Sequence, residues 1–456
     1  MQPIRLLRAL YLTDRILYAM GGLMMLFVAA FALRQWAGSA GLGQIFFSLG
    51  ISGAAALAAL SVTDIALLFG KMVRVRGVRE TPKVLSLSDE NTVRLHLTNT
   101  GSLPISLEVI DELPDQFQKR DFNLRLSLKP DEEQVHAYTL RPVRRGEYRF
   151  HAINIFARTQ LGLWERRFRE EAHRTVPVYP SVLQMKQFEL QAFTRISTME
   201  GIKRMRRIGN GFEFEQIRTY VQGDDYRSIN WKATGRRNDL MVNQYEDERS
   251  QQVYVVIDKS RSMKMPFRGM SLLDHAINAG LALSNIILKK HDRAGLLTFS
   301  DKIGSAIKAD NGPGQLHRIL EALYREEERP DEANFELLYT SVRQFVGRRS
   351  LLLLFTNFES HYAMMRALPE LRRINRQQVL VVVFFENTEI SDYLRKSPQT
   401  VEDIYVETTA RHFVNEKQRI VHELRQYGIQ SILTRPENLT LDTINKYLEL
   451  KAKGAI

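Results

Sequence analysis

The chain has 456 residues, and its 64 Lys and Arg against 52 Asp and Glu give a formal net charge of +12. Hydrophobic residues make up 44% and charged residues 25%, which is typical of globular proteins and excludes wholesale disorder. Cysteine is absent, so disulfide scaffolds, cysteine-ligated metal sites and thiol catalysis are excluded. The length predicts about three structural units. The positive charge is compatible with either nucleic-acid binding or a membrane protein.

Residues 1–72 contain two long apolar runs, which predict a transmembrane hairpin with helices at about 16–33 and 42–69. The first run would be about 27 Å long as a helix. The short linker between the runs includes Trp36, a residue type suited to the membrane interface. The alternative is a cleaved signal peptide followed by a buried helix. The first run is longer than a typical signal core, however, and the second run follows at once.

The orientation of the hairpin follows from the positions of Lys and Arg. Basic residues flank both outer ends of the hairpin, whereas the linker holds only Arg34. The positive-inside rule therefore predicts that both termini and the soluble domains are cytoplasmic. Asp64 lies late in the second run. We expect it at the inner membrane interface rather than in a proton relay.

Residues 73–185 change to an alternation of apolar and polar side chains. Val93, Leu95 and Leu97, for example, alternate with polar residues, and turn residues separate the runs. This pattern predicts an antiparallel β-sandwich of about 100 residues. No catalytic cluster is visible in it, so a spacer or interaction module is expected.

Residues 186–250 form a basic, polar connector that includes the run Lys203 to Arg207. A solvated face or a contact with anionic lipid is favoured for this run. Nucleic-acid binding is not expected, because no aromatic residues of the base-stacking kind are interleaved with the basic ones.

Residues 251–456 alternate buried strands with amphipathic helices. The strands Val253–Ile257, Leu351–Phe355 and Val379–Phe385 are continuous apolar runs, as expected for strands that are buried on both faces. The pattern predicts a doubly wound, Rossmann-like α/β domain with a mostly parallel sheet. Such sheets bind ligands at the carboxyl ends of their strands, where the strand order reverses.

The first of these strands is followed by the pattern D-x-S-x-S, formed by Asp258, Ser260 and Ser262. Oxygen ligands of this kind suit a hard divalent cation, above all Mg²⁺. The same residues could instead cap a turn and the following helix. The pattern and its place in the chain resemble the metal-ion-dependent adhesion site of the von Willebrand factor type A fold.

The resemblance implies that a Thr from a second loop and an Asp after a later strand complete the site, and that a partner protein often adds a carboxylate. Here Asn334 and Asn357 stand at those two places. Because an amide oxygen carries no charge, the affinity for Mg²⁺ should be lower. Glu359 could compensate, or it could be a solvated loop residue. Whether Mg²⁺ occupies the site therefore stays open.

A longer signature precedes the α/β domain. Its members are Arg218, Tyr220, Gly223, Asp224, Asp225, Arg227, Trp231 and Lys232. The pattern R-x-Y-x-x-G-D-D-x-R-x-I-x-W-K resembles the bacterial family called domain of unknown function 58. The resemblance implies a protein of the bacterial inner membrane, often encoded beside a MoxR-type AAA+ ATPase, that acts in the assembly or maturation of other complexes.

The signature interleaves acidic and basic residues. This arrangement favours ion pairs that join the connector to the α/β domain over a set of catalytic carboxylates. The signature residues are therefore expected to be structural, and Trp231 is expected to be a packing anchor.

The leading hypothesis is a non-enzymatic, membrane-anchored adaptor that binds partner proteins at the strand ends of the α/β domain. One alternative is a metal-dependent hydrolase that uses Asp258 and the acidic signature. Another is an envelope structural protein that works through its β domain. The chain has no G-x-x-x-x-G-K-[ST], H-E-x-x-H or G-x-S-x-G motif. An enzyme with a small-molecule substrate is therefore not expected.

Overall fold

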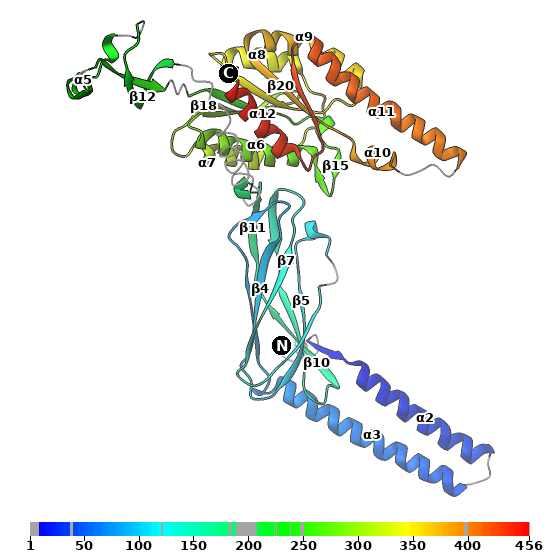
Figure 1. Cartoon of the computed structure of the whole chain (residues 1–456). Helices are drawn as coiled ribbons and strands as arrows, with labels where there is room; N and C mark the ends of the chain where they lie inside the picture. The colour runs from blue at the N-terminus through cyan, green and yellow to red at the C-terminus, as the bar shows by residue number, and fades with distance from the viewer. Residues whose placement is uncertain are drawn as a thin grey trace. The chain divides into compact units, whose positions relative to one another are not determined.

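The computed structural model describes residues 9–36, 40–119, 122–181, 185–187, 208–222, 224, 226–237, 239–246, 250–395 and 400–455. The chain divides into two compact units, residues 1–178 and 179–456 (Figure 1). The predicted fold class is confirmed: two long apolar helices, a β-sandwich-like domain and an α/β domain with a mostly parallel sheet.

The N-terminal helices α2 (Asp14–Trp36) and α3 (Ala40–Phe69) are both long and apolar enough to cross a membrane. Large apolar side chains on them are exposed, as Met24 at 69% and Phe31 at 67% show. Glycine lets the helices approach each other, since a Cβ on Gly50 would lie 2.9 Å from the Phe27 ring. A Cβ on Gly21 or Gly22, by contrast, would have no neighbour within 4 Å.

The sandwich-side end of α3 is fixed to the β-sandwich by a buried carboxylate. Asp64 accepts hydrogen bonds from the Leu163 amide at 2.9 Å, the Trp164 amide at 3.0 Å and the Thr159 hydroxyl. Arg166 donates to the Leu68 carbonyl at 2.7 Å, where the last carbonyls of α3 lack partners within the helix. The role of Asp64 in this structure is therefore to hold the helix on the sandwich.

The sandwich consists of antiparallel strands arranged in three sheets. The first sheet has the order β1 (Leu10–Leu12), β10 (Trp164–Glu170), β9 (Ile153–Arg158), β5 (Ile105–Asp111) and β6 (Leu124–Leu128). The second sheet comprises β3 (Leu85–Ser86), β11 (Arg174–Tyr179) and β8 (Gly146–Phe150), and the third β2 (Val75–Glu80), β4 (Asn91–Asn99) and β7 (Glu133–Leu140). The alternation along β4 buries Val93, Leu95 and Leu97 completely.

The signature lies in a β-hairpin of the second unit, which we call the signature hairpin. It consists of β12 (Ile208–Thr219), β13 (Met241–Glu246) and the short helix α5 (Trp231–Arg237) in the connection between them. The basic run Lys203 to Arg207 lies outside the described residues.

The α/β sheet has the strand order β18-β17-β14-β19-β20-β21, and every neighbouring pair is parallel except β18 with β17. The strands are β14 (Gln252–Asp258), β17 (Arg293–Phe299), β18 (Ile303–Asp310), β19 (Leu351–Phe355), β20 (Val379–Phe385) and β21 (Gln430–Thr434). A small hairpin, β15 (Pro266–Phe267) with β16 (Met270–Ser271), precedes the first helix.

Helices cover both faces of this sheet (Figure 1). One apolar core contains α6 (Leu272–Lys289), α7 (Gln315–Arg325) and α12 (Leu439–Ala452), and the other contains α8 (Phe335–Phe345), α9 (His361–Gln377) and α11 (Val401–Gln426). Successive residues of β14 alternate between the two cores, because neighbouring side chains of a strand point to opposite faces. The small helix α10 (Thr388–Tyr393) precedes α11.

The strand order reverses between β14 and β19. After β14 the chain builds β17 and β18 on one side, and it then returns to build β19, β20 and β21 on the other side. The loops at the carboxyl ends of β14 and β19 therefore diverge and leave a crevice between them.

Asp64→Leu is expected to destabilise the first unit, because it leaves the amides of Leu163 and Trp164 without their acceptor. Each unsatisfied buried amide costs about 1–3 kcal/mol. Urea unfolding of the full-length protein in detergent micelles, followed by tryptophan fluorescence, measures this loss. Asp64→Asn, which keeps one acceptor oxygen, should lose less stability, and equal stability of all three proteins would contradict the proposed anchoring role.

Candidate functional site

The candidate site begins at the carboxyl end of β14 with Asp258, whose side chain is completely buried. Its Oδ1 accepts a hydrogen bond from the Ser260 amide at 2.8 Å. Its Oδ2 accepts one from the Thr356 hydroxyl at 2.7 Å and lies 3.5 Å from the Ser262 hydroxyl. The hydroxyls of Ser260 and Ser262 lie 3.1 Å apart. The three residues of the D-x-S-x-S pattern therefore lie together at this strand end.

The environment of Asp258 provides hydrogen bonds but no positive charge. Within the described part of the chain, no Lys, Arg or His pairs with this carboxyl group. Burial raises its pKa above the usual carboxyl range, and the hydrogen bonds from Thr356, Ser260 and Ser262 oppose that shift. A cation bound beside Asp258 would compensate for the burial of its charge.

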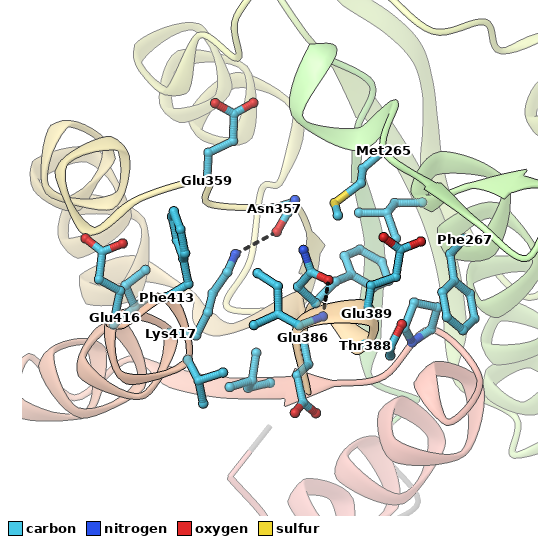
Figure 2. A pocket seen from close by; sticks show the side chains of 18 of the residues that line it. Met265, Phe267, Asn357, Glu359, Glu386, Thr388, Glu389, Phe413, Glu416 and Lys417 are labelled. Carbon is cyan, nitrogen blue, oxygen red and sulfur yellow. Dashed lines mark hydrogen bonds between the residues drawn. The ribbon is translucent and has the colours of Figure 1, made fainter. Parts of the chain in front are cut away.

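Asn357 lies next to this group, but its side chain has two partners of its own. Its Nδ2 donates to the Ser262 carbonyl at 3.2 Å. Its Oδ1 accepts from Lys417 Nζ at 3.0 Å (Figure 2). Lys417 also donates to the Phe358 carbonyl. The oxygen that was predicted to bind a metal is therefore already in contact with an ammonium group.

Lys417 reaches this position from α11. Burial lowers its pKa to about 8, while the nearby Glu359 and Glu416 act in the opposite direction. Near neutral pH most Lys417 side chains still carry the positive charge, so a second cation close to Asn357 meets electrostatic repulsion.

Asn334 also lies at this end of the sheet, where it serves as the N-cap of α8. Its Oδ1 accepts from the Leu337 amide at 3.0 Å, a hydrogen bond that stabilises the first turn of a helix. Asn334 lines the same cleft as Asp258, Ser260, Ser262 and Asn357. All five candidate metal ligands therefore face one cleft, although the two Asn oxygens are engaged in other contacts.

A buried ion pair holds the loop before α8 against the first loop. Lys259 Nζ lies 2.6 Å from Glu326 Oε2, and Glu326 Oε1 accepts from the Thr298 hydroxyl at 2.7 Å. The Arg329 amide donates to the Lys259 carbonyl at 2.8 Å. These contacts position the loop that carries Asn334 beside the loop that carries Ser260.

The cleft has a volume of about 580 Å³ and is mainly acidic. Glu332 pairs with Arg261 at 2.9 Å and with Arg366 at 3.1 Å. The other acidic side chains that line it are Asp258, Asp301, Asp331, Glu336, Glu359 and Glu370. A cleft of this composition attracts cationic groups.

The donor atoms at this site are oxygens, which suit a hard cation, but together they carry little negative charge. Asp258, Ser260, Ser262 and Thr356 offer oxygen atoms, as Mg²⁺ requires. Asp258 supplies the only carboxylate among these four. Among the described residues, no group of three or more His, Cys, Asp or Glu side chains is placed to hold a metal. Any Mg²⁺ here would be held weakly.

The signature residues lie apart from this cluster in the chain, in the signature hairpin. Arg218 Nη2 lies 2.5 Å from Asp224 Oδ1, and Asp224 Oδ2 accepts from the Val221 amide at 2.9 Å. The hydrogen bond from Arg218 is the main reason why the pKa of Asp224 is lowered. Tyr220 donates its amide to the Leu240 carbonyl at 2.7 Å. Gly223 and Asp225 lie outside the described residues.

Trp231 is not a packing anchor, contrary to our expectation from the sequence, because its side chain is 70% exposed. It is the first residue of α5, and this short helix contacts β13 through Thr234, whose hydroxyl accepts from the Met241 amide at 3.0 Å. Arg227 and Lys232 are also exposed.

Sequence reasoning did not identify two residues that shape the site. Thr356 directly follows the buried run Leu351–Phe355, so its position at a strand end was the available signal. Lys417 lies 60 residues beyond Asn357 on a helix with many charged residues, and no local pattern distinguishes it.

The comparison with known families assigns the part of the chain that carries the signature and most of the α/β domain. Residues 216–413 match the family model "Protein of unknown function DUF58". The match covers 198 of the 456 residues, less than half of the chain.

Curated relatives of this chain are themselves described as uncharacterized. YeaD of Bacillus subtilis is 24% identical over 160 residues, which cover 35% of this chain and 38% of YeaD. Rv1480 of Mycobacterium tuberculosis is 23% identical over 184 residues, which cover 40% of this chain and 57% of Rv1480. The chain therefore spans less than two thirds of either relative.

Solved structures with similarity to this chain include a CARDB domain of Pyrococcus furiosus. The TM-score is 0.18 and the identity 18%, and the match covers 25% of this chain and 97% of that domain. Another is the conserved hypothetical protein BatB of Bacteroides thetaiotaomicron, with a TM-score of 0.23 and 13% identity, covering 30% of this chain and 68% of BatB. At these TM-scores neither structure bears on function.

The raised pKa of Asp258 predicts the sign of a pH dependence. The native state holds the Asp258 proton more tightly than the unfolded chain does, so this group's contribution to stability falls as pH rises from the usual carboxyl pKa through the raised value. Asp258→Asn removes this effect. In the presence of a chelator, the free energy of unfolding of the wild type minus that of the variant should therefore decrease between pH 4 and 7. The decrease should be about 1.4 kcal/mol for each unit of pKa difference.

Urea unfolding of the full-length protein, followed by circular dichroism at several pH values, measures this difference. The other carboxyl groups titrate in both proteins and cancel in the subtraction. A difference that is independent of pH, or that grows with pH, would contradict the prediction.

Proposed function

We propose that this chain is a non-enzymatic, membrane-anchored adaptor whose C-terminal α/β domain, similar to the von Willebrand factor type A fold, binds partner proteins at its strand-end cleft. The observation that carries the proposal is the group formed by Asp258, Ser260, Ser262 and Thr356 beside the strand-order reversal. Ligand-binding residues in doubly wound sheets gather at this position.

Membrane anchoring is supported by the exposed apolar surfaces of α2 and α3. The pairing of β1 with β10 adds a topological argument, because β1 precedes both helices and β10 follows them. Both strands belong to one sheet, so the two ends of the helical hairpin must be on the same side of the membrane. Two crossings satisfy this condition. The excess of Lys and Arg outside the linker supports the cytoplasmic side.

Mg²⁺ would be held by Asp258, Ser260 and Ser262, with Thr356 beside them, and it would supply a positive centre that accepts a carboxylate from the partner. The engagement of Asn334 and Asn357 in other contacts favours weak binding in the absence of a partner. A MoxR-type AAA+ ATPase is the partner that the family resemblance suggests. Any nucleotide hydrolysis would then occur in that partner rather than in this chain.

The test is a calorimetric titration of the full-length protein in detergent with Mg²⁺. We expect a dissociation constant of about 10⁻⁴ to 10⁻³ M, because the donor set holds a single carboxylate. Asp258→Ala should abolish the heat of binding. Asp331→Ala removes one negative charge from the same cleft but lies outside the donor set. Its dissociation constant for Mg²⁺ should stay within about twofold of the wild-type value.

Equal binding by wild type and Asp258→Ala would contradict the metal site. Partner binding is tested separately, by co-purification with a MoxR-type ATPase in the presence and absence of Mg²⁺. If the ATPase does not co-purify with the wild-type protein either with or without Mg²⁺, the proposed partner is wrong, even if calorimetry shows that Mg²⁺ binds.

A further inference from the structure

A second, more apolar pocket lies beside the acidic cleft, at the carboxyl ends of β19, β20 and β21. Its volume is about 300 Å³. Met265, Phe267 and Phe413 contribute apolar surface to it (Figure 2), and Ile390 also lines it. Met265 is 40% exposed and Phe413 46% exposed. The pocket is preformed and large enough for one aromatic side chain.

The rim of this apolar pocket is acidic. Glu359, Glu389 and Glu416 stand around it, and Lys417 is the single Lys or Arg among the described residues that line it. Lys417 is directed at Asn357 and the Phe358 carbonyl rather than at the rim. A matching ligand therefore combines an apolar anchor with positive charge.

The signature hairpin offers such a ligand surface. Large apolar side chains on it are exposed, among them Trp231 at 70%, Tyr226 at 69% and Val221 at 60%. The exposed basic residues beside them are Arg227, Lys232, Arg236 and Arg237. Trp, Tyr and Arg are the residue types that contribute most to binding at protein interfaces, and exposed apolar groups of this kind mark an interaction site.

We propose that the signature hairpin of one copy docks on the apolar pocket of a second copy of this chain, with Trp231 entering the pocket and Arg236 and Arg237 facing Glu389 and Glu416. The two surfaces match in polarity and in the sign of their charge. Such a contact joins two different surfaces of the same chain, so it is heterologous and builds rings or filaments rather than a closed twofold dimer.

The connectivity of the domain favours a second copy over the same copy. The signature hairpin ends with β13 at Glu246, and β14 begins at Gln252. The hairpin is thus attached at the amino end of β14, whereas the pocket lies at the carboxyl edge of the sheet. This self-association goes beyond the proposed adaptor function and requires neither Mg²⁺ nor Asp258.

The test is sedimentation velocity of the full-length protein in detergent over a range of protein concentrations. The wild type should associate as its concentration rises. Trp231→Ser should weaken the association at least tenfold, since anchor residues of this type dominate interface affinity. Arg236→Glu with Arg237→Glu, and separately Glu389→Arg with Glu416→Arg, should each abolish it, because like charges then face each other.

Mixing the two charge-reversed variants provides the decisive result. In the mixture, the acidic hairpin of one variant meets the basic pocket of the other, and the two unchanged surfaces also match. Association should therefore return to within about tenfold of the wild type. Arg348→Glu with Arg349→Glu, an equal charge change on exposed residues before β19, is the matched control and should associate like the wild type.

Circular dichroism of every variant confirms that it is folded. A wild type that stays monomeric at all concentrations would overturn the proposal. The proposal would also fail if Trp231→Ser or either charge-reversed variant, tested alone, associated like the wild type. A mixture of the two charge-reversed variants that stays monomeric would overturn it as well. Asp258→Ala should associate normally, so failure of the metal site and failure of self-association are distinguishable.

Discussion

The carboxyl ends of parallel strands meet at one edge of a sheet, and the candidate functions of this protein depend on that constraint. It brings Asp258 from β14 and Thr356 from β19 into hydrogen-bond contact, although they are 98 residues apart in the chain. The same edge carries Asn357, the acidic cleft and the apolar pocket. The two apolar cores that cover the faces of the sheet hold this edge in place, and a buried ion pair between Lys259 and Glu326 fixes the neighbouring loops.

The fold could be predicted from the sequence wherever one local pattern determined the structure. Continuous apolar runs identified the central strands, and D-x-S-x-S at a strand end identified the cluster around Asp258. Asn334 was harder to interpret, because an Asn before a helix suits both a ligand and an N-cap, and the structure shows it as a cap. The contact of Lys417 with Asn357 depends on how α11 packs, which no local pattern encodes. The exposure of Trp231 could not be predicted because a large aromatic residue is usually buried.

The charge of the side chains at the carboxyl-end edge of the α/β sheet differs from the net charge of the chain as a whole. The net charge of +12 describes the average, whereas Asp and Glu outnumber Lys and Arg among the residues that line both pockets at this edge. Basic residues are prominent instead on the signature hairpin. Such a separation of charge steers association towards defined pairs of surfaces and makes it sensitive to ionic strength.

The pairing of β1 with β10 has a consequence for synthesis of the chain on the ribosome. β1 leaves the ribosome before both long helices, but its partner strand emerges only after most of the sandwich has been made. Under the proposed membrane anchoring, the edge strand β1 stays unpaired while the two helices insert into the bilayer, and a contact of such large sequence separation forms slowly. Under the same proposal, completion of the sandwich would mark a correctly inserted hairpin, since a chain with only one crossing would leave β1 on the wrong side of the membrane.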